Sequence, residues 1–299
     1  MTAERRATFL ALAAVLLWST VASAFKLSLE YLAPIQLLAW ATLFSVLTLG
    51  GLLVVSGQWR QLRQCRRGDL WRSLVLGCCN PFLYYVVLFE AYDRLPAQEA
   101  QPLNYTWAFT LALLAIPLLG QRLSRWDVIG GLIAYSGVWV IATRGQVFAV
   151  EFANPVGVAL ALGSTVLWAL YWIGSARDPR PPLVALFCNF AAAVPLVIIT
   201  CALTTGLAVA DWRGIAGAAY VGAFEMGIAF ALWLAAMRAT SSAARIGNLI
   251  FLSPFLSLVF IRLLVGEAIL PSTVVGLGLI VTGLVLQQAL RGRSAPAAG

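Results

Sequence analysis

The sequence has no histidine and little charge, since only 11% of its 299 residues are charged. A soluble domain usually carries about 25% charged residues because its exterior must face water. An ordinary water-soluble protein is therefore excluded, and the commonest zinc ligand and proton relay is missing. The five cysteines have no metal-ligand spacing, so we expect small core residues, no metal site and no cofactor.

The sequence is rich in long apolar stretches. Hydrophobic residues make up 61% of it, and the mean hydropathy is +0.89. Roughly 20 apolar residues in a helix cross a hydrocarbon core about 30 Å thick. We predict an all-α, multi-pass protein of the cell (inner or plasma) membrane with ten transmembrane helices. The expected spans are residues 7–29, 34–55, 70–92, 97–119, 128–143, 155–173, 182–204, 215–237, 243–265 and 272–287.

The first span has a second interpretation. Arg5 and Arg6 precede an apolar run that ends in Ala22-Ser23-Ala24, as in a secretory signal peptide with its cleavage site. We favour a transmembrane helix because this span has a counterpart in the second half of the chain, where Trp168 falls opposite Trp18.

The basic residues indicate the orientation. With a cytoplasmic N-terminus, 15 of the 20 basic residues fall inside, and every inner loop holds more than either neighbouring outer loop. The positive-inside rule then predicts that the N- and C-termini are both cytoplasmic. Because the charges lie between spans and form no stripe, we expect a lipid bilayer as partner and no nucleic acid. The inner set is Arg5, Arg6, Arg60, Arg63, Arg66, Arg67, Arg72, Arg122, Arg125, Arg177, Arg180, Arg238, Arg245, Arg291 and Arg293.

An internal repeat appears at a constant offset of 146 residues, where Gly130 matches Gly276 and Gly137 matches Gly283. Seven residues make about two helical turns, so both glycines of each fifth span lie on one face and allow close helix packing. We predict two five-helix repeats, residues 1–145 and 146–299. Because each has an odd number of spans, the second is inverted relative to the first, as in many transporters.

Two stretches end the predicted halves, LLGQRLSRWDVIGGLIAYSG and LLVGEAILPSTVVGLGLIVTG. They resemble the drug/metabolite transporter superfamily with tandem EamA-type domains, over essentially the whole chain. Within it, Asn104-Tyr105-Thr106-Trp107 resembles the YddG-type aromatic amino acid exporters, whose pattern is Asn-Tyr-Leu-Trp-Pro; this chain has Thr106 and Ala108 instead. The resemblance implies export of amino acids, aromatic or otherwise bulky and apolar, and related metabolites. A drug, nucleoside or sugar carrier of the same superfamily is the alternative.

Three ionisable residues lie well inside the expected spans, where a charge costs several kcal/mol unless it faces a cavity or a partner. Glu225 lies near the middle of the eighth span. It is a candidate to bind a substrate ammonium or a proton, and a protonated carboxyl bonded to a neighbouring helix is an equal alternative. Lys26 and Glu90 share a depth near the outer face. For them we favour a structural ion pair or snorkelling over a gate.

Polar and aromatic residues share the middle layer of several spans. Tryptophan and tyrosine usually prefer the membrane interface, so their presence at mid-depth favours a hydrated central cavity over packing alone. Such a cavity would stack against aromatic or bulky apolar substrates and hold an ammonium by cation–π attraction. The expected cavity residues are Trp18, Asn80, Tyr84, Asn104, Tyr105, Trp107, Trp168 and Glu225.

These features predict a carrier that works by alternating access around the central cavity. An intramembrane enzyme would need a nucleophile–base pair or a metal cluster at one depth, and neither pattern is present. We therefore expect no enzyme activity, and a receptor is also disfavoured. The expected partner is a small amino acid-like molecule, and the sequence is compatible with a monomer.

Overall fold

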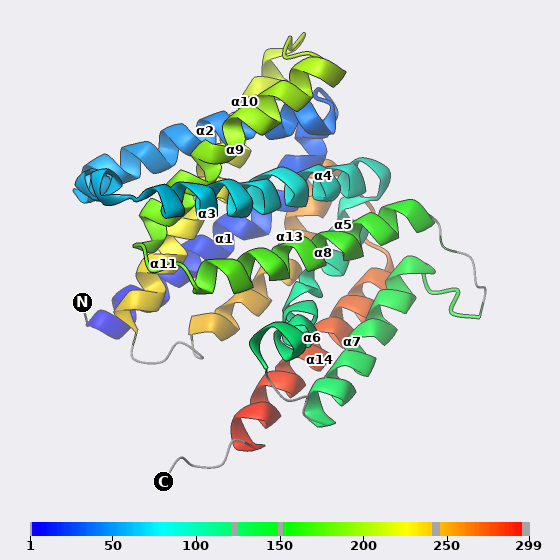
Figure 1. Ribbon diagram of the computed structural model, residues 1–299. Coiled ribbons are helices and arrows are strands. Elements are labelled where there is room, and N and C mark those ends of the chain that lie inside the picture. Colours follow the sequence, from blue (N-terminus) through cyan, green and yellow to red (C-terminus); the bar gives the residue numbers. More distant parts are fainter. Residues whose placement is uncertain (1, 121–124, 149–151, 153, 241–245, 295–299) are drawn as a thin grey trace.

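The computed structural model describes residues 2–120, 125–148, 152, 154–240 and 246–294; the regular elements within these ranges are all helices, and no strand is among them (Figure 1). The all-α prediction is therefore confirmed. The first part contains α1 (Ala3–Leu29), α2 (Pro34–Val55), η1 (Gln58–Gln64), α3 (Arg67–Gly77), η2 (Cys78–Leu83), α4 (Tyr84–Arg94), α5 (Ala97–Tyr105), α6 (Trp107–Leu119) and α7 (Arg125–Ala142). The second contains α8 (Pro155–Ala176), α9 (Pro182–Thr204), α10 (Trp212–Tyr220), η3 (Val221–Ile228), α11 (Ala229–Ala239), η4 (Asn248–Leu252), α13 (Ser253–Phe260), η5 (Ile261–Val265) and α14 (Pro271–Ser294).

Seven helices of the described chain are long and apolar enough to cross a membrane, and they coincide with seven of the ten expected spans. The other three spans fall on α7, on the shorter segment Leu249–Val265 and on Pro271–Gln287. The count of ten spans and the cytoplasmic termini therefore stay predictions. Residues 243–245 of the ninth span, which include Arg245, and the inner-set residue Arg122 lie outside the described residues.

Local chemistry sets several helix ends. Pro155 occupies the first turn of α8, where its missing N–H is not needed, and the side chain of Asn154 accepts a 2.9 Å hydrogen bond from the Gly157 N–H. Gly120 ends α6 with φ +66°, and Gly266 ends η5 with φ +79°. These two glycines are matched at the offset of 146 residues, and each adopts a left-handed conformation that favours glycine.

A π-helical turn interrupts each of the two segments expected as spans three and eight. The first, η2, joins α3 to α4, and the second, η3, joins α10 to α11. In η2, Asn80 leaves the helical conformation (φ −145°, ψ 119°), because Pro81 disfavours a helical residue before it and has no N–H to donate. Glu225 lies in η3. Turns of this type are frequent at functional sites.

Helices α7 and α14 lie side by side at one edge of the molecule (Figure 1). Gly130 faces Gly283 and Gly137 faces Gly276, so the two helices run antiparallel. A Cβ atom added at Gly130 would lie 2.6 Å from the carbonyl oxygen of Gly283, and one added at Gly276 would lie 2.6 Å from that of Gly137. The contact therefore requires glycine at these positions, because the backbones themselves meet.

The first helix packs against elements from the far end of the chain. Helix α1 contacts α11 and α13, and the Trp18 ring meets the Phe230 ring edge-on at 5.5 Å between centroids. From α2, the Ser45 hydroxyl donates to the Met226 carbonyl oxygen at 3.0 Å. The predicted halves thus pack against each other around the centre of the molecule, where the cavity lies.

Candidate functional site

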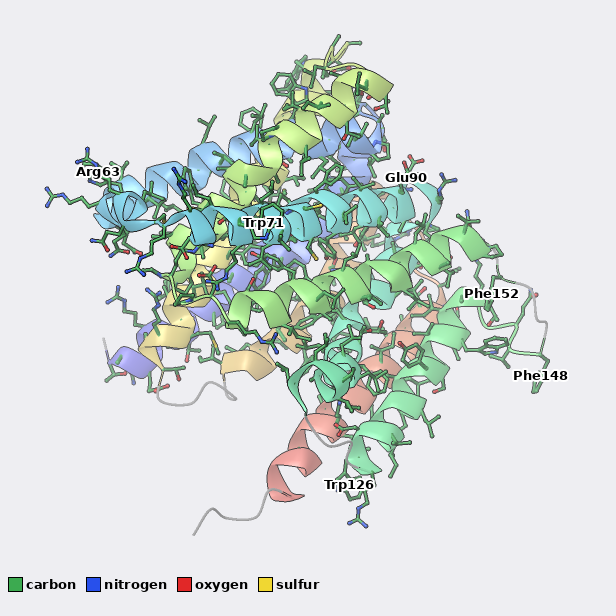
Figure 2. All side chains as sticks on the ribbon, viewed as in Figure 1. Arg63, Trp71, Glu90, Trp126, Phe148 and Phe152 are labelled. Atoms are coloured by element: carbon green, nitrogen blue, oxygen red, sulfur yellow. The ribbon has the colours of Figure 1, made fainter. Side chains whose placement is uncertain are left out.

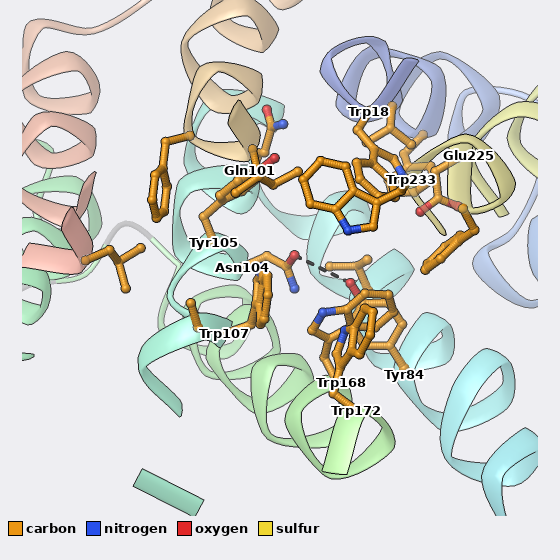
Figure 3. Close-up of a pocket in the computed structure, with 18 of the residues that line it drawn as sticks. Trp18, Tyr84, Gln101, Asn104, Tyr105, Trp107, Trp168, Trp172, Glu225 and Trp233 are labelled. Atoms are coloured by element: carbon orange, nitrogen blue, oxygen red, sulfur yellow. Dashed lines mark hydrogen bonds between the residues drawn. The ribbon is translucent and has the colours of Figure 1, made fainter. Parts of the chain in front are cut away.

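A cavity of about 660 Å³ lies between α1, α4, α5, α6, α8, α11, η3, η4 and α14 (Figure 3). Its size is typical of small-molecule sites. Seven of the eight expected cavity residues line it: Trp18, Tyr84, Asn104, Tyr105, Trp107, Trp168 and Glu225. The eighth, Asn80, does not line it and is fully buried within η2. Asn80 leaves the helical conformation, and its side chain is enclosed by protein instead of facing the cavity.

Aromatic rings form most of the cavity wall. Trp168 is central, with ring centroids 4.6 Å from Tyr84, 5.9 Å from Phe230 and 6.4 Å from Trp107. Across the cavity, the Trp18 and Trp233 rings lie 5.4 Å apart (Figure 3). The same rings therefore pack against one another and face the cavity. The lining also includes Trp172, Phe230, Trp233 and Phe251, which were not predicted because nothing in their local sequence distinguishes them from packing residues.

Glu225 is held by a hydroxyl from another helix. The Tyr85 hydroxyl lies 2.8 Å from Oε1 and 2.9 Å from Oε2 of Glu225. Tyr85 is fully buried, and Glu225 is 9% exposed. Among the described residues that line the cavity, Glu225 is the single carboxyl group, and none is lysine or arginine. The cavity is therefore electrostatically suited to a ligand that carries a positive group.

Two amides lie across the cavity from Glu225 (Figure 3). The Asn104 amide donates to the Ser164 hydroxyl at 2.8 Å, and its Oδ1 accepts a long 3.5 Å bond from the Tyr84 hydroxyl. Gln101 is 3% exposed, lines the cavity, and neither polar atom of its amide has a hydrogen-bond partner in the described part of the chain. A buried amide without partners is unusual, so Gln101 is available to a ligand. Gln101 was not among the residues predicted from the sequence.

Lys26 and Glu90 do not form the expected ion pair. The Lys26 ammonium donates to the carbonyl oxygens of Tyr92 at 2.8 Å and Leu95 at 3.0 Å, at the end of α4. Glu90 instead pairs with Arg94 at 2.9 Å, one turn along the same helix. The expected pairing was wrong because the last carbonyls of a helix lack partners and attract a cation; snorkelling of Lys26 stays a prediction. Neither residue lines the cavity.

A second set of polar contacts joins α5 to the segment before α14 and to the first turn of α14. On α5 these contacts lie one turn from Gln101. Glu267 accepts the Ala97 N–H at 2.8 Å and the Gln98 N–H at 3.2 Å, where the positive end of the α5 dipole favours an anion. The Gln98 amide donates to the Ala268 carbonyl at 2.9 Å. It also accepts two hydrogen bonds, from the Leu270 N–H at 2.8 Å and the Thr273 hydroxyl at 3.1 Å. We name this set the Glu267 cluster: Ala97, Gln98, Glu267, Ala268, Leu270 and Thr273.

The EamA-like transporter family matches residues 5–143 and again residues 155–287. The chain belongs to this family. Its relatives include the aromatic amino acid exporter YddG of Ancylobacter novellus, 29% identical over 258 residues that cover 84% of this chain and 86% of that protein. The YddG exporter of Escherichia coli is 25% identical over 243 residues, covering 70% and 79% of the two chains. A solved crystal structure matches with a TM-score of 0.68 at 25% identity, covering 97% of this chain and 98% of the other.

These findings confirm the predicted resemblance to the drug/metabolite transporter superfamily and to its YddG-type exporters. The EamA family protein is a multi-pass protein of the cell membrane. Its exporter relatives imply transport of a small molecule. Among the residues that the structure describes, no group of three histidine, cysteine, aspartate or glutamate side chains could hold a metal ion.

Proposed function

We propose that this EamA family protein exports amino acids whose side chains are aromatic or otherwise bulky and apolar. The observation that carries the proposal is the aromatic cavity, whose lining among the described residues has one carboxyl group and two amides. Such a cavity offers stacking surfaces for an apolar side chain and polar partners for an amino acid head group. The aromatic amino acid exporters among its relatives support the same substrate class.

Each part of the substrate has a proposed partner. Trp18, Trp107 and Trp168 stack against the side chain. Glu225, oriented by Tyr85, attracts the ammonium group. Because no basic side chain lines the described cavity, the substrate carboxylate would be bound by neutral donors, foremost the amide of Gln101. These roles require the substrate to span the cavity from Glu225 to the amide side (Figure 3).

The proposed mechanism is alternating access between two inverted halves, residues 1–145 and 146–299, with ten spans and both termini in the cytoplasm. The Glu267 cluster joins the proposed halves at the end of the cavity expected to face outward. Its contacts would have to break before the cavity opens to that side. Exchange of conformations between inverted repeats is the general way in which such carriers switch access.

The test is uptake by vesicles that contain the purified protein, with a panel of labelled amino acids. We expect saturable flux of aromatic or bulky apolar amino acids that unlabelled substrate competes away. Glu225→Gln should lose most of this flux, whereas the matched control Glu90→Gln, whose carboxyl lies outside the cavity lining, should retain it. Folded protein without flux of any amino acid would refute the substrate class. Full flux in Glu225→Gln would remove this residue from the mechanism.

A second candidate, export of aromatic organic cations, is favoured by one observation. Within the described lining, one acidic side chain faces no basic side chain, so a ligand with a positive group and no carboxylate leaves no anion unpaired. Competition of the labelled flux by tryptophan, tryptamine and indole-3-propionate separates the two candidates. An amino acid carrier should prefer tryptophan, and a cation carrier should prefer tryptamine. Strong competition by indole-3-propionate would refute a role for Glu225 as the group that binds the ammonium.

A further inference from the structure

The connection between α2 and α3 concentrates positive charge at one end of the molecule. Four exposed arginines, which we name the arginine cluster, lie on η1 and at the start of α3: Arg60, Arg63, Arg66 and Arg67. The acid of this connection, Asp69, already accepts the backbone N–H of Arg66 at 2.8 Å and lies 3.8 Å from the Arg72 guanidinium. It therefore does not neutralise the cluster.

The cluster differs from three arginines at the opposite end of the molecule. These three arginines lie on the side that we expect to face outward. Each of them pairs with a carboxylate: Arg94 at 2.9 Å, Arg144 at 2.7 Å and Arg213 at 2.8 Å. By contrast, no carboxylate of the described residues lies within 4 Å of a guanidinium nitrogen of the arginine cluster. The general excess of inner positive charge explains the side of the membrane. It does not explain four unpaired cations within eight residues.

Aromatic and apolar side chains accompany the cluster. The guanidinium carbons of Arg60 and Arg63 lie 5.8 and 5.3 Å from the centroid of the Trp59 ring. Trp71, one turn into α3, is 68% exposed. Figure 2 places Arg63 beyond the ends of the helices, Trp71 on the outer surface of α3, and Glu90 at the opposite end. Tryptophan at this level is typical of the membrane interface, where the ring enters the apolar layer and nearby cations meet the head groups.

We propose that the arginine cluster, with Trp59 and Trp71, is a binding site for the head groups of anionic phospholipids. Guanidinium groups bind phosphate in a bidentate manner, and four to eight basic residues next to a membrane helix are typical of anionic-lipid recognition. A lipid can contact both the basic and the aromatic part of this surface, since its phosphate would bind the arginines while its acyl chains would pack against Trp71. This site is independent of the transported substrate.

The test is native mass spectrometry of the purified full-length protein, with phosphatidylglycerol and phosphatidylcholine added in turn. The wild-type protein should bind phosphatidylglycerol in preference, and this preference should fall steeply with added salt. Replacing Arg60 and Arg63 together by glutamine should weaken phosphatidylglycerol binding about tenfold or more. The matched control replaces Arg5 and Arg6, which are also exposed basic residues on the expected inner side, and should change the binding little.

Two further measurements keep the proposal falsifiable if the glutamine variant folds poorly. Replacing Arg60 and Arg63 by lysine keeps the charge and should retain most of the lipid preference. Inorganic phosphate at millimolar concentration should not displace the lipid, because it lacks the acyl chains. Equal binding of both lipids, equal loss in the control pair, or displacement by inorganic phosphate would each overturn the proposal.

Discussion

Replacing Glu267 by glutamine tests whether the Glu267 cluster holds one end of the cavity closed. The carboxylate accepts two backbone N–H groups of the first turn of α5, at 2.8 and 3.2 Å. Glutamine keeps one acceptor oxygen but turns an NH₂ group toward the second N–H, so one charge-assisted bond and the interaction with the helix dipole are lost. Hydrogen bonds to charged groups contribute about 1.5–3 kcal/mol. We expect a loss of about 2 kcal/mol, which shifts the ratio of closed to open molecules about 30-fold.

The assay is the rate at which a membrane-impermeant maleimide labels a cysteine placed in the cavity. Leu88 lines the cavity and is buried, so Leu88→Cys, in a background without the five native cysteines, reports opening toward the expected outer side. Labelling from outside should accelerate in Glu267→Gln by roughly the factor of the population shift. The matched control is Glu90→Gln, which removes a carboxylate on the same expected outer side, where it pairs with Arg94 on its own helix.

Two results would contradict this expectation. If Glu267→Gln labels at the wild-type rate while its thermal unfolding is unchanged, the cluster does not open during transport and the reasoning about closure is wrong. If Glu90→Gln accelerates labelling equally, the effect comes from net charge at that surface. At the offset of 146 residues, Glu267 is matched with Gln121. The first half of the sequence therefore already has glutamine at the corresponding position.

Three other predictions follow from the packing. Gly137→Ala should lower the unfolding midpoint because its Cβ would meet the Gly276 backbone, whereas Gly278→Ala, whose Cβ would have no neighbour within 4 Å among the described residues, should not. Trp168→Ala should weaken substrate affinity about tenfold by removal of a stacking ring, with Trp168→Phe retaining most of it; equal affinity in all three proteins would assign the ring to packing. Burial raises the pKa of the Asp178 carboxyl, but hydrogen bonds and charge from Arg180 outweigh burial and hold that pKa below its usual value. Asp178→Asn should therefore lower stability at neutral pH by about 3 kcal/mol. Thermal unfolding should show this difference begin to shrink near the unfolded-state pKa of about 3.9 and vanish only as the pH falls through the lower pKa of the folded state.

The sequence identifies residues whose role depends only on their depth in the membrane. Trp18, Trp107 and Trp168 stand at mid-span in an apolar chain, which marks them without any knowledge of their neighbours, and the structure places them on one cavity. Asn80 has the same depth and yet lies outside the lining. Depth is set by position along a helix, but the direction of a side chain depends on how that helix is rotated and broken, and the turn at Pro81 changes both.

Which side chains form hydrogen bonds or ion pairs with each other could be found only from the tertiary structure. Lys26 and Glu90 share a depth, which favoured a pair, but Glu90 has a closer cation on its own helix and Lys26 has the free carbonyls at the end of α4. Tyr85 and Gln101 were missed for the same reason. Nothing in either local sequence states that one hydroxyl reaches Glu225 or that one amide faces the cavity without a partner.

The sequence by itself determined the membrane class, the helical content and the family, because these depend on apolar length and on patterns repeated along the chain. It also marked Gly130, Gly137, Gly276 and Gly283, since two turns of helix put each pair on one face. Only the tertiary structure decided that α7 meets α14 through these glycines, that Tyr85 holds Glu225 and that Glu267 caps α5. Each of these contacts joins residues more than 100 positions apart, and their distance in space is set by the packing of many helices together.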